Sequence, residues 1–318
     1  MKHSAAISEG HPVKPGVLRR FLDGDLFHSF RNTPVAIVAA IVAAIMVFGA
    51  IFANLIAPHT PFDLATLSLD NSLLPPAWMA DGHLSYPLGT DDQGRDVFST
   101  ILYGSRISLL VGLAAVALAM ILGVGLGLLS GYLGGRLDAF IMRVADVQLS
   151  FPAILIALLI DGAARAALPS DIHTDMLSLI VLIGSIGLAN WVQYARTVRG
   201  STFVEKSKEY VQAARVIGVR PWRIMIRHVL PNVLGPVLVI ATINVATAII
   251  TEATLSFLGV GVPPTSPSLG TMINTGNQFL YSGEWWLVVF PGAALVLLCM
   301  SVNLLGDWLR DALNPKLR

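Results

Sequence analysis

The sequence predicts an all-α integral membrane protein with six transmembrane helices, and two observations lead to this fold class. Hydrophobic residues make up 54% of the 318 residues and charged residues only 13%, about half of the ~25% that is usual in soluble proteins. Several intervals without a charged residue reach the roughly 20 residues that a membrane-spanning helix needs. The single cysteine, Cys299, excludes an intrachain disulfide and a cysteine-based metal site.

Five charge-free intervals are long enough to cross a membrane, whereas a sixth, 147–160, is too short by itself. We expect this third helix to begin near Ala139, with Arg143 and Asp146 paired three residues apart on its first turns. The first interval begins after Arg31 and exceeds the apolar core of a signal peptide, so we interpret it as a retained span. The predicted spans are 34–57, 106–133, 139–160, 177–195, 231–251 and 286–306.

The distribution of basic residues predicts which side each connecting segment faces. Six spans place both ends of the chain on one side, and 18 of the 21 Lys and Arg residues lie on that side. The positive-inside rule makes that side cytoplasmic. It holds the N-terminal tail 1–33, the segment 133–148, the loop 196–230 and the C-terminal tail 307–318, while 58–105 forms a long extracytoplasmic loop. The N-terminal tail is either an amphipathic helix along the membrane surface or a solvated basic segment.

The loop between the fourth and fifth spans carries local signals for two helices joined by a tight turn. Thr202 and Glu205 have the spacing of a capping box, which predicts that the first helix begins there. Gly218 is placed to end this helix in the left-handed conformation, and Pro221 suits the first position of a second helix. We expect Pro231 to start the fifth span.

Apolar side chains indicate a second role for this helix pair. Tyr210, Ala214 and Ile217 have the spacing of one apolar stripe on the first helix. A solvated loop that only sets membrane topology needs neither capped ends nor an apolar face, and an exposed apolar face usually marks an interface. The spacing therefore favours a docking element over a solvated basic loop, although both interpretations stay open.

Part of this loop resembles the EAA loop of permease subunits of ABC importers. The resemblance is carried by Gln212-Ala213-Ala214, Gly218 and Leu230-Pro231, with Gln212 where glutamate is usual and His228 where isoleucine is common. In that family the loop seats in a groove of the ATPase subunit. The resemblance implies an ATPase-coupling role for Tyr210, Gln212, Ala213, Ala214, Gly218, Pro221, Arg223, Leu230 and Pro231.

The resemblance extends over most of the chain. LGTDDQGRDVFSTILYGSRISLLVG (88–112), SFLGVGVPPTSPSLGTMI (256–273) and GDWLRDALNPKLR (306–318) are similar to the second permease subunit of dipeptide and oligopeptide importers. This implies a type I ABC importer permease-like fold with a permease core at 106–306 and a cytoplasmic coupling helix pair. It also implies peptide import through a bacterial cytoplasmic (inner) membrane.

The expected partners follow from what the chain lacks and from the resemblance. It has no Gly-Lys dipeptide and hence no G-x-x-x-x-G-K-[ST] phosphate loop, so ATP and Mg²⁺ are expected on partner subunits and no cofactor on this chain. The sequence contains no H-E-x-x-H motif, so this signal for a zinc site is missing. The resemblance implies a second homologous permease subunit in a heterodimer, two ATPase subunits or domains, an extracytoplasmic substrate-binding protein and membrane lipid, and no nucleic acid.

Polar residues inside the spans are candidates for the substrate path. Asn190, Gln193 and Asn244 lie within the fourth and fifth predicted spans, where polar groups usually face the bundle interior or a wet cavity. Hydrogen bonding between helices is the competing interpretation, and we favour it for each residue taken singly. Glu252 ends the fifth predicted span, either as a gate that contacts a substrate ammonium group or as an acid at the membrane interface.

The outer loop offers candidate contacts for a binding protein. Thr90 and Gln93 have capping-box spacing, which predicts a short outer helix. The candidate contacts on it are Asp91, Asp92, Arg95 and Asp96. The same residues could instead cap and hold the loop, which we favour for the first two.

Two other functions compete with that of a transport subunit. An intramembrane enzyme needs a nucleophile–base pair or paired carboxylates inside the spans, and these are not evident, so we expect no enzymatic activity. A stand-alone secondary transporter or channel is less favoured, because no inverted repeat or midplane charge is evident. Within the leading interpretation, glutathione, nickel complexes and opine-like compounds are alternative substrates.

Overall fold

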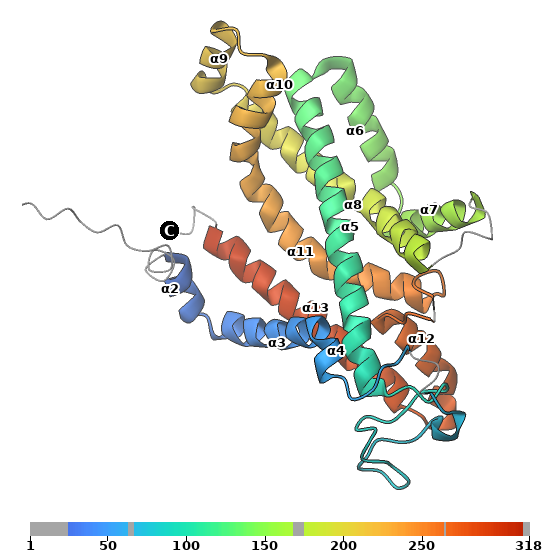
Figure 1. Cartoon of the computed structure of the whole chain (residues 1–318). Coiled ribbons are helices and arrows are strands. Elements are labelled where there is room, and N and C mark those ends of the chain that lie inside the picture. Colours follow the sequence, from blue (N-terminus) through green and yellow to red (C-terminus); the bar gives the residue numbers. More distant parts are fainter. Residues whose placement is uncertain (1–24, 63–66, 168–174, 264, 314–318) are drawn as a thin grey trace, which may run out of the picture.

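The molecule is an assembly of helices (Figure 1). Within the described part of the chain, Thr90 and Asp96 form an isolated β-bridge and there is no strand. Five helices of that part are long and apolar enough to cross a membrane, and a bent helix pair raises this to six if the pair is one span. The predicted all-α fold class is confirmed, with five or six candidate spans. The computed structural model describes residues 25–62, 67–167, 175–263 and 265–313.

Twelve α-helices follow one another along the described residues. They are α2 (Asp25–Arg31), α3 (Pro34–Ile51), α4 (Ala53–Ile56), α5 (Val97–Leu133), α6 (Gly135–Leu149), α7 (Ala153–Ala167), α8 (Asp175–Glu205), α9 (Glu209–Val216), α10 (Pro221–Ile224), α11 (Leu230–Phe257), α12 (Leu269–Phe279) and α13 (Trp286–Leu313). Two 3₁₀ turns, Leu69–Asn71 and Leu280–Ser282, and a π-helical segment, Met225–Val229, complete the set for the described residues.

Helix α5 begins at Val97, nine residues before the predicted start of the second span at 106. Its N-cap is Asp96, whose carboxylate accepts the backbone N–H of Ser99 at 2.9 Å. The predicted short helix around residues 90–96 is wrong, since these residues form a turn before α5. Thr90 does not act as a helix cap: its hydroxyl oxygen accepts the N–H of Leu74 at 2.8 Å and donates to a backbone carbonyl.

The third predicted span, 139–160, is not one straight helix. It consists of α6 and α7, which meet at a bend of 99°. Pro152 stands at the break, where its missing N–H and its ring disfavour a continuous helix. The expected pair between Arg143 and Asp146 is not formed, because Asp146 instead bonds Arg196 of α8. Sequence spacing alone missed a partner on a neighbouring helix.

Helix α8 continues ten residues past the predicted end of the fourth span at 195. Thr202 and Glu205 therefore lie in its last turn, both buried, and the capping box predicted to start a new helix there is wrong. The next helix, α9, begins at Glu209 instead.

Helix α10, the π-helical segment and α11 follow one another without a break. Together they form one helical segment, Pro221–Phe257, that is long and apolar enough to cross a membrane. Pro231 lies in the first turn of α11, as expected for the start of the fifth span, although the π-helical segment before it continues into α11 without a break. Helix α11 ends at Phe257, six residues past the predicted end of the fifth span at 251. Helix α13 likewise extends to Leu313, past the predicted 306.

Little of the tail 1–33 can be compared with the structure. Only the short helix α2 and the residues that lead into α3 belong to the described part of this tail. Residues 1–24, which include the first part of the predicted amphipathic helix, lie outside the described residues.

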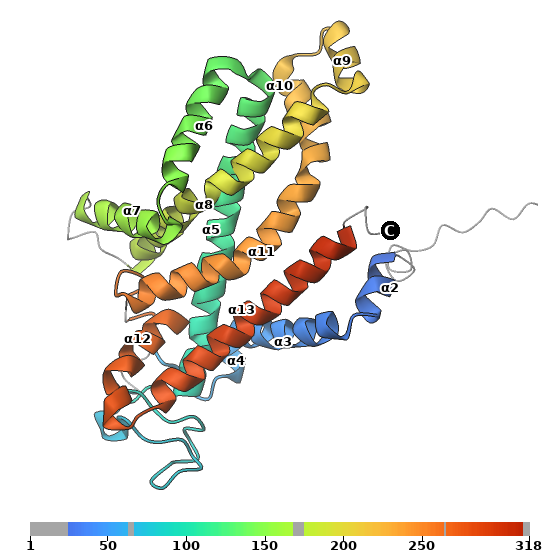
Figure 2. The same cartoon turned by 180° about the vertical axis from the view of Figure 1, so that it is seen from behind.

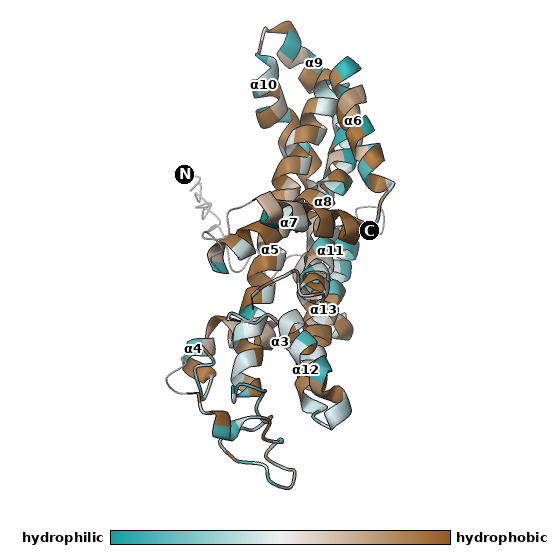
Figure 3. Cartoon of the chain, turned by 90° about the vertical axis from the view of Figure 1, so that its right-hand side faces the viewer, coloured by the Kyte–Doolittle hydropathy of each residue, from teal (hydrophilic) through white to brown (hydrophobic). Residues whose placement is uncertain are grey.

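Helix α5 runs the length of the molecule and is the centre of its packing (Figures 1 and 2). Its most extensive partner is α8, and α11, α3, α13 and α12 also contact it. The α9 end of the molecule is formed by α9, α10 and the adjoining ends of α5, α6 and α8; the α12 end holds α12 and the loop before α5. Hydrophobic residues follow the long helices, and hydrophilic residues gather toward the two ends (Figure 3).

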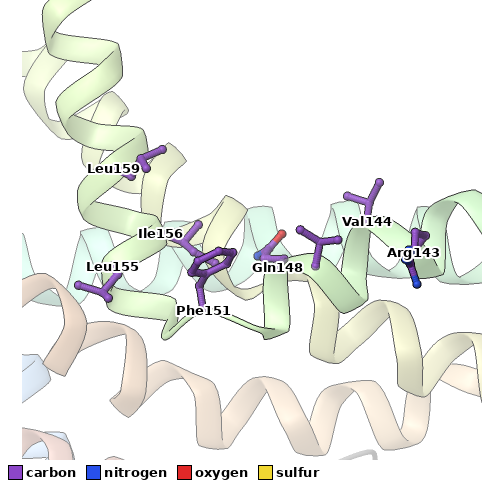
Figure 4. A pocket seen from close by; sticks show the side chains of 8 residues that line it. Arg143, Val144, Gln148, Phe151, Leu155, Ile156 and Leu159 are labelled. Carbon is purple, nitrogen blue, oxygen red and sulfur yellow. The ribbon is translucent and has the colours of Figure 1, made fainter.

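The bend between α6 and α7 leaves an apolar groove of about 500 Å³. Figure 4 shows Phe151 at the bend, with leucine and isoleucine side chains of α7 on one side and Val144 and Arg143 of α6 on the other. An exposed apolar surface of this kind fits a membrane or another protein chain better than water.

Candidate functional site

The turn between α9 and α10 is built by a glycine in the left-handed conformation. Gly218 has φ = +81° and is the C′ residue of α9, as predicted. Its N–H donates to the carbonyl of Arg215 at 3.0 Å, and the N–H of Val219 donates to the carbonyl of Ala214 at 3.0 Å. These two bonds close the end of α9 in the manner of a Schellman motif. Pro221 then occupies the first turn of α10, also as predicted.

Tyr210 fastens the base of α9 to two long helices. Its hydroxyl donates to Glu205 at the end of α8 at 2.5 Å, and Asn232 of α11 donates to the same hydroxyl at 3.1 Å. Partial burial, followed by the hydrogen bond to the Glu205 carboxylate, raises the pKa of Tyr210 to about 12. The helix pair is therefore held on a fixed base rather than tethered by a loose loop.

Helix α9 and the segment before it are also tied to the end of α5. Lys206 donates to the carbonyl of Gly131 at 2.7 Å, and the Arg215 guanidinium lies 5.0 Å from the centre of the Tyr132 ring. Burial and the nearby positive charge of Arg215 lower the pKa of Lys206. Nearby, Arg199 of α8 holds Asp138 of α6 by two bonds of 2.5 and 2.7 Å.

The outward surface of α9 and α10 combines exposed apolar side chains with arginines. Val216 is 87% exposed and Ile217 78%, with Trp222 and Ile226 about half exposed. The predicted stripe of Tyr210, Ala214 and Ile217 is corrected: the buried pair is Val211 with Ala214, because these side chains pack on the core. The exposed arginines around the surface are Arg215, Arg220, Arg223 and Arg227.

The predicted coupling residues lie together at this end of the molecule, each with a distinct environment. Gln212 is exposed, and its amide donates to the carbonyl of Lys206 at 3.0 Å. A glutamate at that position could not donate this bond. Ala213 and Arg223 are exposed, whereas Leu230 and Pro231 lie where α11 begins. The sequence analysis did not single out Val216, Asn232 and Tyr132. For Val216 there was a signal, the alternation of arginine with apolar residues in ARVIGVRPWRIMIR (214–227).

The candidate path residues are brought together in part. Asn244 of α11 donates to the side-chain oxygen of Gln193 of α8 at 3.3 Å, on an exposed part of the bundle. Asn190 donates to the carbonyl of Ile186 within its own helix at 2.8 Å. Hydrogen bonding between helices, the favoured interpretation for each single residue, is found for Gln193 and Asn244, whereas Asn190 bonds within its own helix.

Glu252 lies elsewhere and is fully buried. It stands five residues before the end of α11, not at the end of a span as expected. Ser108 of α5 donates to one carboxylate oxygen at 2.7 Å, and Ser256 donates to the other at 2.8 Å. In this conformation the carboxylate faces protein hydroxyl groups rather than an open path.

The four candidate residues of the outer loop mostly serve the loop itself. Asp91 accepts the N–H groups of Gln93 and Arg95 at 2.9 Å, and it bonds the Arg95 guanidinium at 2.6 Å. Asp91, Arg95 and Asp96 are buried. Burial and the neighbouring Asp91 charge raise the pKa of Asp92, which stays partly exposed. These contacts favour the structural role for the loop.

An ion pair that sequence reasoning did not single out fixes α7. Arg165 bonds Asp161 at 2.6 Å and donates to the carbonyls of Val260 and Gly261 at 3.0 and 2.9 Å. The spacing of four residues within one helix was a signal for the pair. The described residues hold no cluster of three or more His, Cys, Asp or Glu that could bind a metal.

A multi-pass helical bundle that carries a projecting helix pair on a fixed base is the architecture expected of a permease, the membrane-embedded subunit of a transport system. The chain belongs to the family of binding-protein-dependent transport system inner membrane components, whose model matches residues 123–318. A second model, the N-terminal TM domain of oligopeptide transport permease C, matches residues 24–76. Membership identifies the chain as an inner-membrane component of a transport system that depends on a binding protein.

Three relatives are similar to this chain over nearly their whole length. The dipeptide transport system permease protein DppC of Escherichia coli (strain K12) is 42% identical over 294 residues, covering 92% of this chain and 93% of the relative. The oligopeptide transport system permease protein OppC of Bacillus subtilis (strain 168) is 36% identical over 318 residues, covering 100% and 97%. The di/tripeptide transport system permease protein DppC of Pseudomonas aeruginosa (strain UCBPP-PA14) is 35% identical over 316 residues, covering 99% and 98%.

A solved structure shares the fold. A chain of the inward-facing MetNI methionine ABC transporter superposes with a TM-score of 0.52 at 20% identity, covering 68% of this chain and 96% of that one. At this identity the likeness shows the fold alone, and it agrees with the predicted type I ABC importer permease-like architecture.

Proposed function

We propose that this chain is one of two permease subunits of an ATP-driven importer of dipeptides or oligopeptides. The exposed apolar and arginine-lined surface of α9 and α10 is the observation that carries the proposal. Such a surface is costly in water and fits a protein partner. The peptide substrate is supported by the names of relatives that match 91% or more of the chain.

In this proposal the α9 end is cytoplasmic and receives the ATPase, while the α12 end receives a substrate-binding protein. The distribution of basic residues supports this orientation, since 18 of the 21 lie in segments assigned to the cytoplasmic side. ATP and Mg²⁺ bind the two ATPase subunits or domains, because this chain lacks a phosphate-binding loop. A second homologous permease completes the translocation path in a heterodimer, and this chain contributes no catalysis.

The mechanical part of the proposal follows from the base of the helix pair. Because Tyr210 joins α9 to both α8 and α11, a displacement of α9 by the ATPase moves the ends of these two helices. Tilting such helices as bodies alternately opens a path to each side of the membrane. Gln193 and Asn244, which meet between α8 and α11, are the candidate path residues that this motion would separate.

The test is uptake by proteoliposomes that contain both permeases and both ATPases, with binding protein outside and ATP inside. We expect labelled dipeptide to accumulate only with ATP and binding protein, and not with an ATPase variant that cannot hydrolyse ATP. Uptake without any ATPase subunit would instead identify a stand-alone carrier. Glutathione, a nickel complex and an opine-like compound serve as competitors, and displacement of the binding-protein ligand by one of them alone would reassign the substrate.

A further inference from the structure

The long helix α5 packs on different partners along its two halves. It has 37 residues, which at the α-helical rise make it about 55 Å long. Toward the α9 end, Gly123, Gly127 and Gly131 form a seam against α8. A Cβ at these glycines would lie only 2.4 to 2.7 Å from the nearest atom of α8, so the two helices are in close contact along this seam. Close-packed contacts compress little and transmit strain, so a displacement of this part of α8 is passed on to α5.

Toward the α12 end, α5 contacts α11 and the start of α12 instead. A Cβ at Gly112 would lie 2.6 Å from Ile249 of α11, and one at Gly104 would lie 3.3 Å from the backbone of Leu269 in α12. Between these two contacts, Ser108 bonds Glu252 of α11. The α12 half of α5 is thus attached to a different part of the bundle from the α9 half.

Glu252 joins three elements at this attachment. Its two carboxylate oxygens accept the hydroxyls of Ser108 on α5 and Ser256 on α11, and the Ser256 hydroxyl oxygen accepts the N–H of Val262 at 3.3 Å. Val262 belongs to the loop that leads from α11 to α12. A fully buried carboxylate whose partner is removed is left unsatisfied, which is costly within a membrane protein. The cluster therefore resists separation of α5 from α11 and this loop.

We infer that α5 is a rigid rod that carries displacement of α9 to the α12 end of the bundle, and that Ser108 and Glu252 are the positioning residues of its far attachment. At the α9 end, three contacts attach α5 to its neighbours: Lys206 donates to the Gly131 carbonyl, Arg215 lies over the Tyr132 ring, and the glycine seam packs against α8. The inference rests on the proposed function. It adds a path through α5: from α9 along α5 to Glu252 near the end of α11, and from there to the α11–α12 loop.

Two fluorescent reporters in the complete reconstituted complex test the rod. Buried Cys299 is replaced by serine, and an environment-sensitive dye is placed on Val204→Cys near the α9 end or on Tyr281→Cys at the α12 end. These two side chains are 65% and 98% exposed, so each accepts a dye without disturbing the core. With otherwise unchanged chains, both reporters should respond when ATP is added with loaded binding protein. If neither reporter responds in the unchanged chains, the result contradicts the proposed function rather than the role of α5 as a rod.

Ser108→Ala removes one hydroxyl donor to Glu252. We expect the Val204 reporter to respond as before, the Tyr281 response to disappear, and the stimulation of ATPase activity by loaded binding protein to fall by roughly three- to tenfold. Ser108→Thr keeps the hydroxyl and should keep both responses. Ser105→Ala is the matched control, since Ser105 is buried on the same helix and its hydroxyl has no hydrogen-bond partner among the described residues.

A second variant keeps the inference testable if Ser108→Ala fails to assemble. Ser256→Ala removes the other donor to Glu252, and the same split between the two reporters is expected. The inference is overturned if either assembled variant retains the full Tyr281 response. It is also overturned if Ser105→Ala abolishes that response as Ser108→Ala does, because the effect would then belong to general packing of α5.

Discussion

Replacing Gly127 with alanine should push α5 away from α8. A Cβ at this position would lie 2.4 Å from the carbonyl oxygen of Ala195 and 2.9 Å from the Cβ of Val198. Carbon–oxygen contacts of this kind are normally about 3.3–3.6 Å, so the helices must separate by about 1 Å. Overpacking of a tight core typically costs about 1–3 kcal/mol.

Gly125, two residues away on the same helix, provides the matched control. No atom lies within 4 Å of a Cβ built there, so Gly125→Ala costs no packing. Alanine in place of glycine inside a helix gains about 0.5–1 kcal/mol. The two alanine variants should therefore differ in free energy of unfolding by about 1–3 kcal/mol, with Gly125→Ala the more stable, because the gain in helix propensity is common to both positions and only the packing cost separates them.

Denaturation of the purified chain in mixed detergent micelles, followed by circular dichroism, measures this difference. The unfolding midpoint should fall for Gly127→Ala and stay or rise for Gly125→Ala, relative to the unchanged chain. Equal midpoints for the two variants would refute the close contact of α5 with α8, because helix propensity affects both positions alike.

Three further predictions concern other contacts. Gly218→Val should lower transport and ATPase coupling, because the left-handed conformation costs about 1–2 kcal/mol for such a residue. Gly218→Asn should be tolerated, and normal coupling by the valine variant would refute the need for this turn. Arg165→Leu leaves the fully buried Asp161 unpaired and should destabilise the chain by about 3–5 kcal/mol in micelle unfolding. The double variant Arg165→Leu with Asp161→Leu should lose less stability, and equal losses for the single and the double variant would contradict the pairing. Tyr210 has a raised pKa of about 12, so its contribution to stability is complete below pH 10 and is lost as the pH rises toward 12. Tyr210→Phe should lack this component of the pH dependence of unfolding. Identical pH profiles for the variant and the unchanged chain would argue against the bonds at the Tyr210 hydroxyl.

Signals that depend on one residue's own conformation can be read in the sequence. Gly218 needs no partner to favour a left-handed C′ position, and Pro221 favours a first helical turn by its fixed φ. The structure has both as predicted. Long apolar intervals likewise predict the helices that can span a membrane, because crossing a bilayer demands length and composition rather than particular contacts.

Signals that depend on which partner a side chain meets lead to wrong predictions. Thr202 and Glu205 have capping-box spacing, yet they lie in the last turn of α8, because packing against α5 continues that helix. Spacing predicts Arg143 as the partner of Asp146, but Asp146 bonds Arg196 of α8. A four-residue motif occurs often by chance, and tertiary contacts decide whether it is used.

Contacts between distant residues cannot be predicted from the sequence at all. Ser108 and Glu252 are 144 residues apart in the chain, and nothing local marks one as the partner of the other. Likewise, the break between α6 and α7 has a local signal in Pro152, but the direction of the bend follows from packing on α8. These features require the arrangement of the helices in space.

A cross-link from the α9–α10 surface tests the central claim most directly. A photoreactive amino acid at Ile217, which is 78% exposed, is compared with one at Leu84, which is 88% exposed in the loop before α5 at the opposite end of the molecule. In the assembled complex in native membranes, position 217 should cross-link to the ATPase subunit and position 84 should not. Absence of the ATPase from the products of position 217, or its appearance among those of position 84, would contradict the account.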